Sequence, residues 1–82
     1  MTVVIVPFPL ASRRAFVERH ARLIAAMNAD AGERHLVRQL RFQMENLQRR
    51  GIAGEVIERE VASLDAAIRA ALWRAVLTPG QR

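Results

Sequence analysis

Two histidines, His20 and His35, supply most of the side-chain chemistry available near neutral pH, because the 82 residues include no Cys and no Tyr. A histidine can ligate a metal, transfer a proton or act as a pH switch. His20 falls in the middle of an apolar helical face, so we favour a simpler interpretation, a partly buried histidine bonded to a neighbouring helix or carbonyl. The two histidines lie on different predicted helices. They can meet near the turn that joins these two helices only if the packing register of the helices aligns them. Their separation of fifteen residues does not by itself require this.

Four arginines mark the polar face of the predicted middle helix: Arg34, Arg38, Arg41 and Arg49. Phe42 points to the side that carries Arg38 and Arg49. Arginine binds phosphates and an aromatic ring can stack on a base, so these residues are candidates for nucleic-acid binding. All thirteen basic residues are Arg, however, and a GC-rich coding sequence explains that bias without a ligand. Phe42 can also be covered by the N-terminal segment or a second subunit, which we favour over base stacking.

The net charge of +5 belongs to residues 1–50, which hold nine arginines and four acidic residues. Residues 51–82 hold four of each and are neutral. An anionic partner should therefore contact the first two helices.

Catalytic and cofactor motifs are not found in the sequence. The segment Gly51-Ile52-Ala53-Gly54 lacks the Lys and the spacing of a phosphate-binding loop. The absence of Cys rules out a disulfide framework and a thiolate zinc site. Asp65 should form an ordinary surface pair with Arg69, four residues on. We therefore expect no enzymatic activity, no cofactor, no metal and no small-molecule substrate.

A helix over residues 30–50 organises the chain. Asp30 is a good N-cap and Glu33 lies at the capping-box spacing, while Gly51 follows two arginines at the other end. Five apolar residues recur at helical spacing between these ends: Leu36, Val37, Leu40, Met44 and Leu47. This stripe predicts a helix buried on one face. Such a helix needs partners to be stable.

Two further helices can supply those partners. One is expected over residues 9–28, with Phe16, Val17, Leu23, Ile24 and Met27 as its apolar stripe. The other is expected over residues 54–78, with a stripe of Ile57, Val61, Leu64, Ile68, Ala71 and Ala75. Trp73 lies beside this last stripe, where a tryptophan can cover the open end of a small core.

The first eight residues read as an extended arm. Residues 2–6 are β-branched, and Pro7 and Pro9 end the segment. The arm can lie across the helices, pair with the arm of a second chain, or add to another protein's sheet. The apolar part of the arm is too short for the core of a signal peptide, and no basic leader precedes it. No apolar run in the chain approaches the ~20 residues of a membrane span. We expect a cytoplasmic protein without a membrane span.

Five short segments of the chain form a recognisable set: Val6-Pro7-Phe8-Pro9-Leu10, Glu33-Arg34-His35-Leu36, Arg49-Arg50-Gly51, Ile57-Glu58-Arg59-Glu60 and Leu72-Trp73-Arg74. Together they resemble a family of short bacterial proteins of unknown function with a VPFPL-type N-terminus. This resemblance supplies no activity, cofactor or catalytic residue that could be transferred to this chain. A strand followed by helices also resembles ribbon-helix-helix DNA-binding dimers. Their strands carry polar or basic side chains, whereas this one offers Thr2 and then only Val and Ile.

The sequence therefore predicts an all-α protein, a single domain over residues 1–82 built as a three-helix bundle with an N-terminal extended arm. The favoured function is a small interaction or assembly module that binds another protein or a second copy. Its candidate interface residues are Val4, Ile5, Val6, Phe8, Phe42 and Trp73. The alternative is a nucleic-acid-binding regulator that uses the four arginines of the middle helix.

Overall fold

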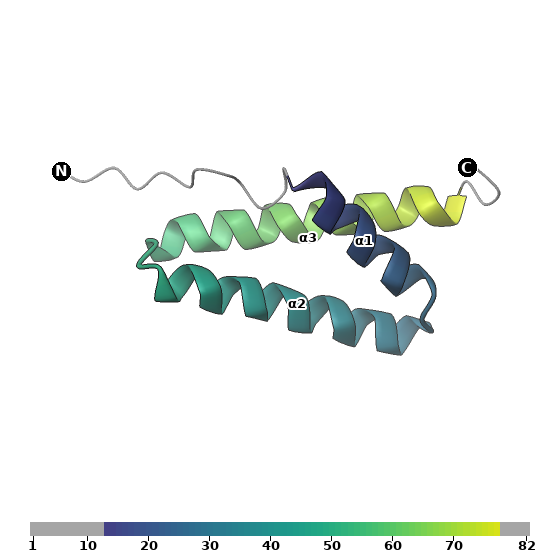
Figure 1. Cartoon of the computed structure of the whole chain (residues 1–82), viewed down its shortest axis with the longest axis horizontal. Helices are drawn as coiled ribbons and strands as arrows, with labels where there is room; N and C mark the ends of the chain where they lie inside the picture. The colour runs from purple at the N-terminus through teal and green to yellow at the C-terminus, as the bar shows by residue number, and fades with distance from the viewer. Residues whose placement is uncertain (1–12, 78–82) are drawn as a thin grey trace.

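The computed structural model describes residues 13–77, which form three α-helices (Figure 1). They are α1 (Arg14–Ala25), α2 (Ala29–Arg49) and α3 (Gly54–Leu77). The predicted three-helix bundle is confirmed. The predicted extended arm lies outside the described residues.

The helices differ in length, and this difference shapes the bundle. α2 and α3 have 21 and 24 residues and run antiparallel side by side, whereas α1 has 12 residues and crosses the half of α3 that leads to its C-terminal end (Figure 1). α1 packs more extensively on α3 than on α2. The other half of the α2–α3 pair has no third helix beside it among the described residues.

The core runs between the three helices and includes most of the predicted stripes. Its buried apolar residues are Val17, Ala21, Ile24, Leu36, Leu47, Ile57, Leu64, Ile68 and Ala71.

The expectation for α2 was wrong at one position. Val37 is 44 % exposed, while Gln43 is buried. The positions 36, 40, 43 and 47 are separated by steps of four, three and four residues, so the inward face follows a heptad-like spacing that includes Gln43. Val37 lies one residue beyond that face.

The start of α2 also differs from expectation. Asn28, not Asp30, is the N-cap: its Oδ1 accepts a hydrogen bond from the Ala31 N–H at 2.8 Å, and its backbone is extended. Both residue types are good caps, and capping by Asn28 places Asp30 in the first turn, where a negative charge still faces the free N–H groups.

The predicted C-terminal signal of α2 is confirmed. Gly51 has a φ of +78°, in the region that favours glycine. The Ile52 N–H donates to the Leu47 carbonyl at 3.1 Å, and the Gly51 N–H donates to the Gln48 carbonyl at 3.0 Å. These two bonds form a Schellman motif, and Ile52 packs on the core that contains Leu47. The motif reverses the chain into α3.

No helix within residues 13–77 is both long enough and apolar enough to cross a membrane.

Candidate functional site

Large apolar side chains are exposed at the C-terminal end of α3. Trp73, Val76 and Leu77 are 64 %, 53 % and 60 % exposed, and we call them the Trp73 surface. α3 is three residues longer than α2, and its last turn extends past the α1–α2 connection (Figure 1). These side chains therefore extend beyond the helices that would otherwise bury them. Trp73 lies near the C-terminal end of α3, and most of its side chain is exposed.

A hollow of about 410 Å³ adjoins this surface, and we call it the apolar hollow. The end of α1, the start of α2 and the last turns of α3 form its walls. Its lining residues are Ile24, Ala25, Met27, Asn28, Ala29, Gly32, Glu33, Leu36, Arg69, Leu72, Trp73 and Val76. Trp73 and Val76 thus belong to both the surface and the hollow, which together make one continuous, mainly apolar face.

Gly32 lets α1 and α2 approach closely beside the hollow. A Cβ atom at this position would lie 2.9 Å from Ile24 Cγ2, closer than two carbon atoms pack. Gly32 is buried although it lies in the first turn of α2. The absence of a side chain therefore sets the distance between the two helices at this end of the bundle.

Paired charges border the hollow. The Arg69 guanidinium donates to both carboxylate oxygens of Glu33, at 2.9 and 3.3 Å, and its Nε donates to Asp65 Oδ1 at 2.8 Å. These two hydrogen-bonded carboxylates raise the pKa of Arg69. The Asp65–Arg69 pair was predicted. Glu33 was expected to support the cap of α2, but its carboxylate links α2 to α3.

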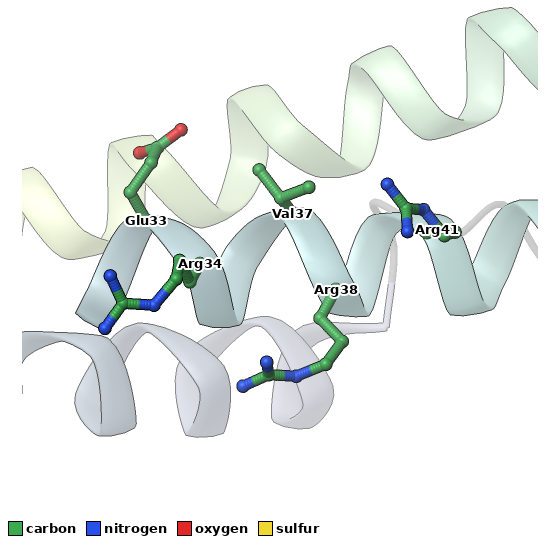
Figure 2. A pocket seen from close by; sticks show the side chains of 5 residues that line it. All are labelled: Glu33, Arg34, Val37, Arg38 and Arg41. Atoms are coloured by element: carbon green, nitrogen blue, oxygen red, sulfur yellow. The ribbon is translucent and has the colours of Figure 1, made fainter. Parts of the chain in front are cut away.

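A second pocket, of about 290 Å³, lies on α2, and we call it the arginine pocket. Figure 2 shows Glu33 and Val37 projecting toward α3, Arg34 lying across the front of α2, and Arg38 projecting away from α3. Arg41 completes the lining. Within residues 13–77, none of these three arginines forms an ion pair or a side-chain hydrogen bond. The arginines lie within a stretch of eight residues, which extends about 10 Å along the helix.

The structure does not bring all the candidate residues to one site. Arg49 donates a hydrogen bond to Asn46 Oδ1 at 2.9 Å and does not line the arginine pocket. Phe42 is 56 % exposed and also lies outside that pocket. The remaining interface candidates, Val4, Ile5, Val6 and Phe8, lie outside the described residues.

The two histidines do meet. His20 Nδ1 lies 3.0 Å from His35 Nε2, and the ring centroids are 5.2 Å apart. The centroid separation is close to the N–N distance plus the two ring radii, so the nitrogens face each other nearly head-on. One nitrogen carries the proton and donates it to the other. His20 is buried against Phe16, with a centroid distance of 4.4 Å, and His35 is half-buried.

Burial lowers the pKa of His20, and the positive charges of His35 and Arg19 lower it further. The sequence interpretation of His20 as a histidine bonded to a neighbouring helix is therefore confirmed, with His35 as its partner.

Gly32 is the signal that could have revealed the contact between the histidines. In two antiparallel helices, residues that face each other have position numbers with a nearly constant sum. The close approach of Ile24 to Gly32 fixes this sum for α1 and α2. The position numbers of His20 and His35 add up to nearly the same value, so these two residues also face each other. A buried glycine inside a helix is a reason to expect a neighbouring helix to pass there.

The fold and these surfaces define a small three-helix bundle with an apolar face at one end and a basic pocket along its middle helix. The chain belongs to the Family of unknown function (DUF6074), whose model matches residues 1–82. The resemblance to a family of unknown function is thus confirmed over the whole chain. No curated protein and no solved structure matches the chain.

Proposed function

We propose that the protein is a small, non-enzymatic interaction module that acts in the cytoplasm, and that its contact face is the Trp73 surface with the apolar hollow. The observation that supports this proposal most strongly is the exposure of Trp73, Val76 and Leu77 side by side next to a hollow. Single exposed apolar residues are ordinary, but a contiguous apolar patch with paired charges at its border is typical of a protein-binding site.

The composition of this face agrees with that proposal. Tryptophan is enriched among the residues that contribute most to binding energy, because its large ring removes much apolar area from water. The neighbouring Arg69 already bonds two carboxylates, so a partner does not have to neutralise it. An apolar centre with a polar border is the usual arrangement of a protein interface.

Site-specific photo-crosslinking in the cell that normally makes the protein tests the proposal. A photoreactive residue at position 76 should give a discrete adduct with a protein. The matched control carries the same group at position 48, where Gln48 is exposed on the last turns of α2. Adducts at neither position, or equal adducts at both, would contradict the proposed contact face.

The arginine pocket supports a second candidate function, nucleic-acid binding. Three arginines without partners among the described residues line one pocket, and the guanidinium groups can contact successive phosphates. Binding to a labelled DNA duplex should then weaken with salt, with a log–log slope of about −0.9 per phosphate contacted.

A matched pair of double variants separates a specific basic site from net charge. Changing Arg38 and Arg41 to Gln should weaken binding and reduce the salt slope. Changing Arg50 and Arg59 to Gln removes the same charge from exposed positions outside the pocket. Equal loss in both pairs would show that the pocket has no special role.

A further inference from the structure

We infer that the partner of the Trp73 surface is a second copy of this chain, which packs against it about a two-fold axis. This inference rests on the proposed function and names the partner of the same face. The axis would pass beside Trp73, so that each copy inserts its tryptophan into the apolar hollow of the other. The shape, the charge and the size of the face each support this pairing.

The shape of the face suits two-fold pairing. A two-fold interface uses the same patch on both copies, so the patch must contain both a projection and a recess. Trp73 is 64 % exposed and forms a wall of the hollow, so the projection and the recess are adjacent. The other walls are mainly apolar and include Ile24, Met27 and Leu72. A half-turn about an axis beside Trp73 places each projection opposite a recess.

The distribution of charge favours this face over others for self-association. Each copy carries a net charge of +5, so two copies repel unless they meet through a part where charges are balanced. At the border of this face one arginine, Arg69, is bonded to the two carboxylates of Glu33 and Asp65, so this border carries no excess of positive charge. A strongly acidic partner would find no excess of opposite charge here. Two copies that meet through this face keep their other arginines apart.

The area of the face indicates how tightly two copies should bind each other. A tryptophan can bury roughly 150–250 Å², and Val76, Leu77 and the walls of the hollow add to it. The total accessible surface of the described chain is 5947 Å², so about 600 Å² per copy would be a tenth of it and would correspond to a small interface. We therefore expect a reversible dimer with a dissociation constant of about 10 µM.

The single tryptophan provides a direct test, because the chain has one Trp and no Tyr. All tryptophan emission therefore comes from position 73. On dilution of the full chain from about 300 µM to about 1 µM, the emission should shift to longer wavelength as Trp73 becomes exposed to water. The mass from light scattering should fall over the same range from twice the 9.2 kDa of one chain toward that value.

Two matched variants identify the face. Val76→Asp should give a monomer with red-shifted emission at every concentration, with helicity checked by circular dichroism. Val37→Asp makes the same change at a comparably exposed valine in the arginine pocket and should keep the dimer. A dimer that persists in Val76→Asp, or one that is lost equally in both variants, would overturn the inference.

Other occupants of the face give different results. If the N-terminal segment covers Trp73 within one chain, the emission is blue-shifted at every concentration and Ile5→Asp moves it to longer wavelength. If nothing covers it, the emission is red-shifted throughout. Either result overturns the dimer. The crosslinking experiment then decides the proposed function separately, because an adduct with a different protein keeps that function and the absence of any adduct rejects it.

Discussion

Acidification should destabilise the bundle through His20. Burial, followed by the charges of His35 and Arg19, lowers the pKa of this imidazole, and the core residues that α3 contributes are apolar. The unfolded chain takes up a proton at about pH 6.5, whereas the folded chain takes it up only at lower pH. Between these two values the unfolded state binds more protons, so the free energy of unfolding falls as the pH falls.

The size of the effect follows from the number of protons. A difference of one proton changes the free energy of unfolding by at most about 1.4 kcal/mol per pH unit. His20 contributes fully above about pH 6.5, and its contribution is lost as the pH falls through the folded pKa. At roughly 0.05–0.15 kcal/mol per residue, a chain of this length has a total stability of about 4–12 kcal/mol. One pH unit therefore removes a measurable fraction of it.

The geometry of the pair explains why acid affects it. In the neutral pair one proton already lies between His20 Nδ1 and His35 Nε2, so the first proton that the pair gains binds an outer ring nitrogen and the two rings stay in contact. A second proton places two cations 3.0 Å apart, one of them buried. Separating them requires α1 to move away from α2, because each helix carries one histidine.

Urea unfolding followed by circular dichroism measures this dependence. The useful range is about pH 7.5 to about pH 5.5, above the ordinary pKa of carboxylates. The wild type should lose stability between about pH 6.5 and about pH 5.5, by at most about 1 kcal/mol, because the unfolded chain gains up to one proton more than the folded chain. His20→Leu should lose much less, because leucine fills the buried space without titrating, and the half-exposed His35 can bond water instead. An equal loss in both proteins would refute the assignment to His20.

The remaining predictions concern stability near neutral pH and use the same urea assay. Gly32→Ala should destabilise the bundle by about 1–3 kcal/mol because the new methyl group clashes with α1. Gly54→Ala, where nothing lies within 4 Å, should stabilise it by about 0.4–1 kcal/mol. Asn28→Ala should cost about 1 kcal/mol and Asp30→Ala clearly less; the reverse order would show that the cap of α2 is misassigned. Leu64→Ala should cost about 2–5 kcal/mol, because its side chain is fully buried.

The helices could be predicted from the sequence because their signals are local. Apolar spacing identified the inward positions Leu36, Leu47, Leu64 and Ile68, and Gly51 marked the end of α2. The hydrogen bonds that stop this helix involve residues 47–52 alone, so they need no information about the rest of the chain. Signals of this kind are contained in a few consecutive residues.

The contacts between helices could not be predicted in the same way. The distance and register between α1 and α2 depend on Gly32, and only that register brings His20 to His35. Glu33 satisfied a local capping pattern, but its partner Arg69 is 36 residues away. The Glu33 carboxylate could have supported the cap of α2 or bonded a residue of another helix. In the folded bundle it bonds Arg69 of α3.

The histidine pair and the Trp73 surface should also depend on each other. Ile24 lies one turn after His20 on α1 and lines the apolar hollow, so any movement of α1 away from α2 changes the shape of that hollow. Acid should therefore weaken the dimer as well as the fold, and the dissociation constant from the dilution series should rise between about pH 7.5 and about pH 5.5. In His20→Leu the dissociation constant should stay nearly constant. If the wild-type dimer is equally strong across this range while its stability falls, the hollow does not depend on the position of α1.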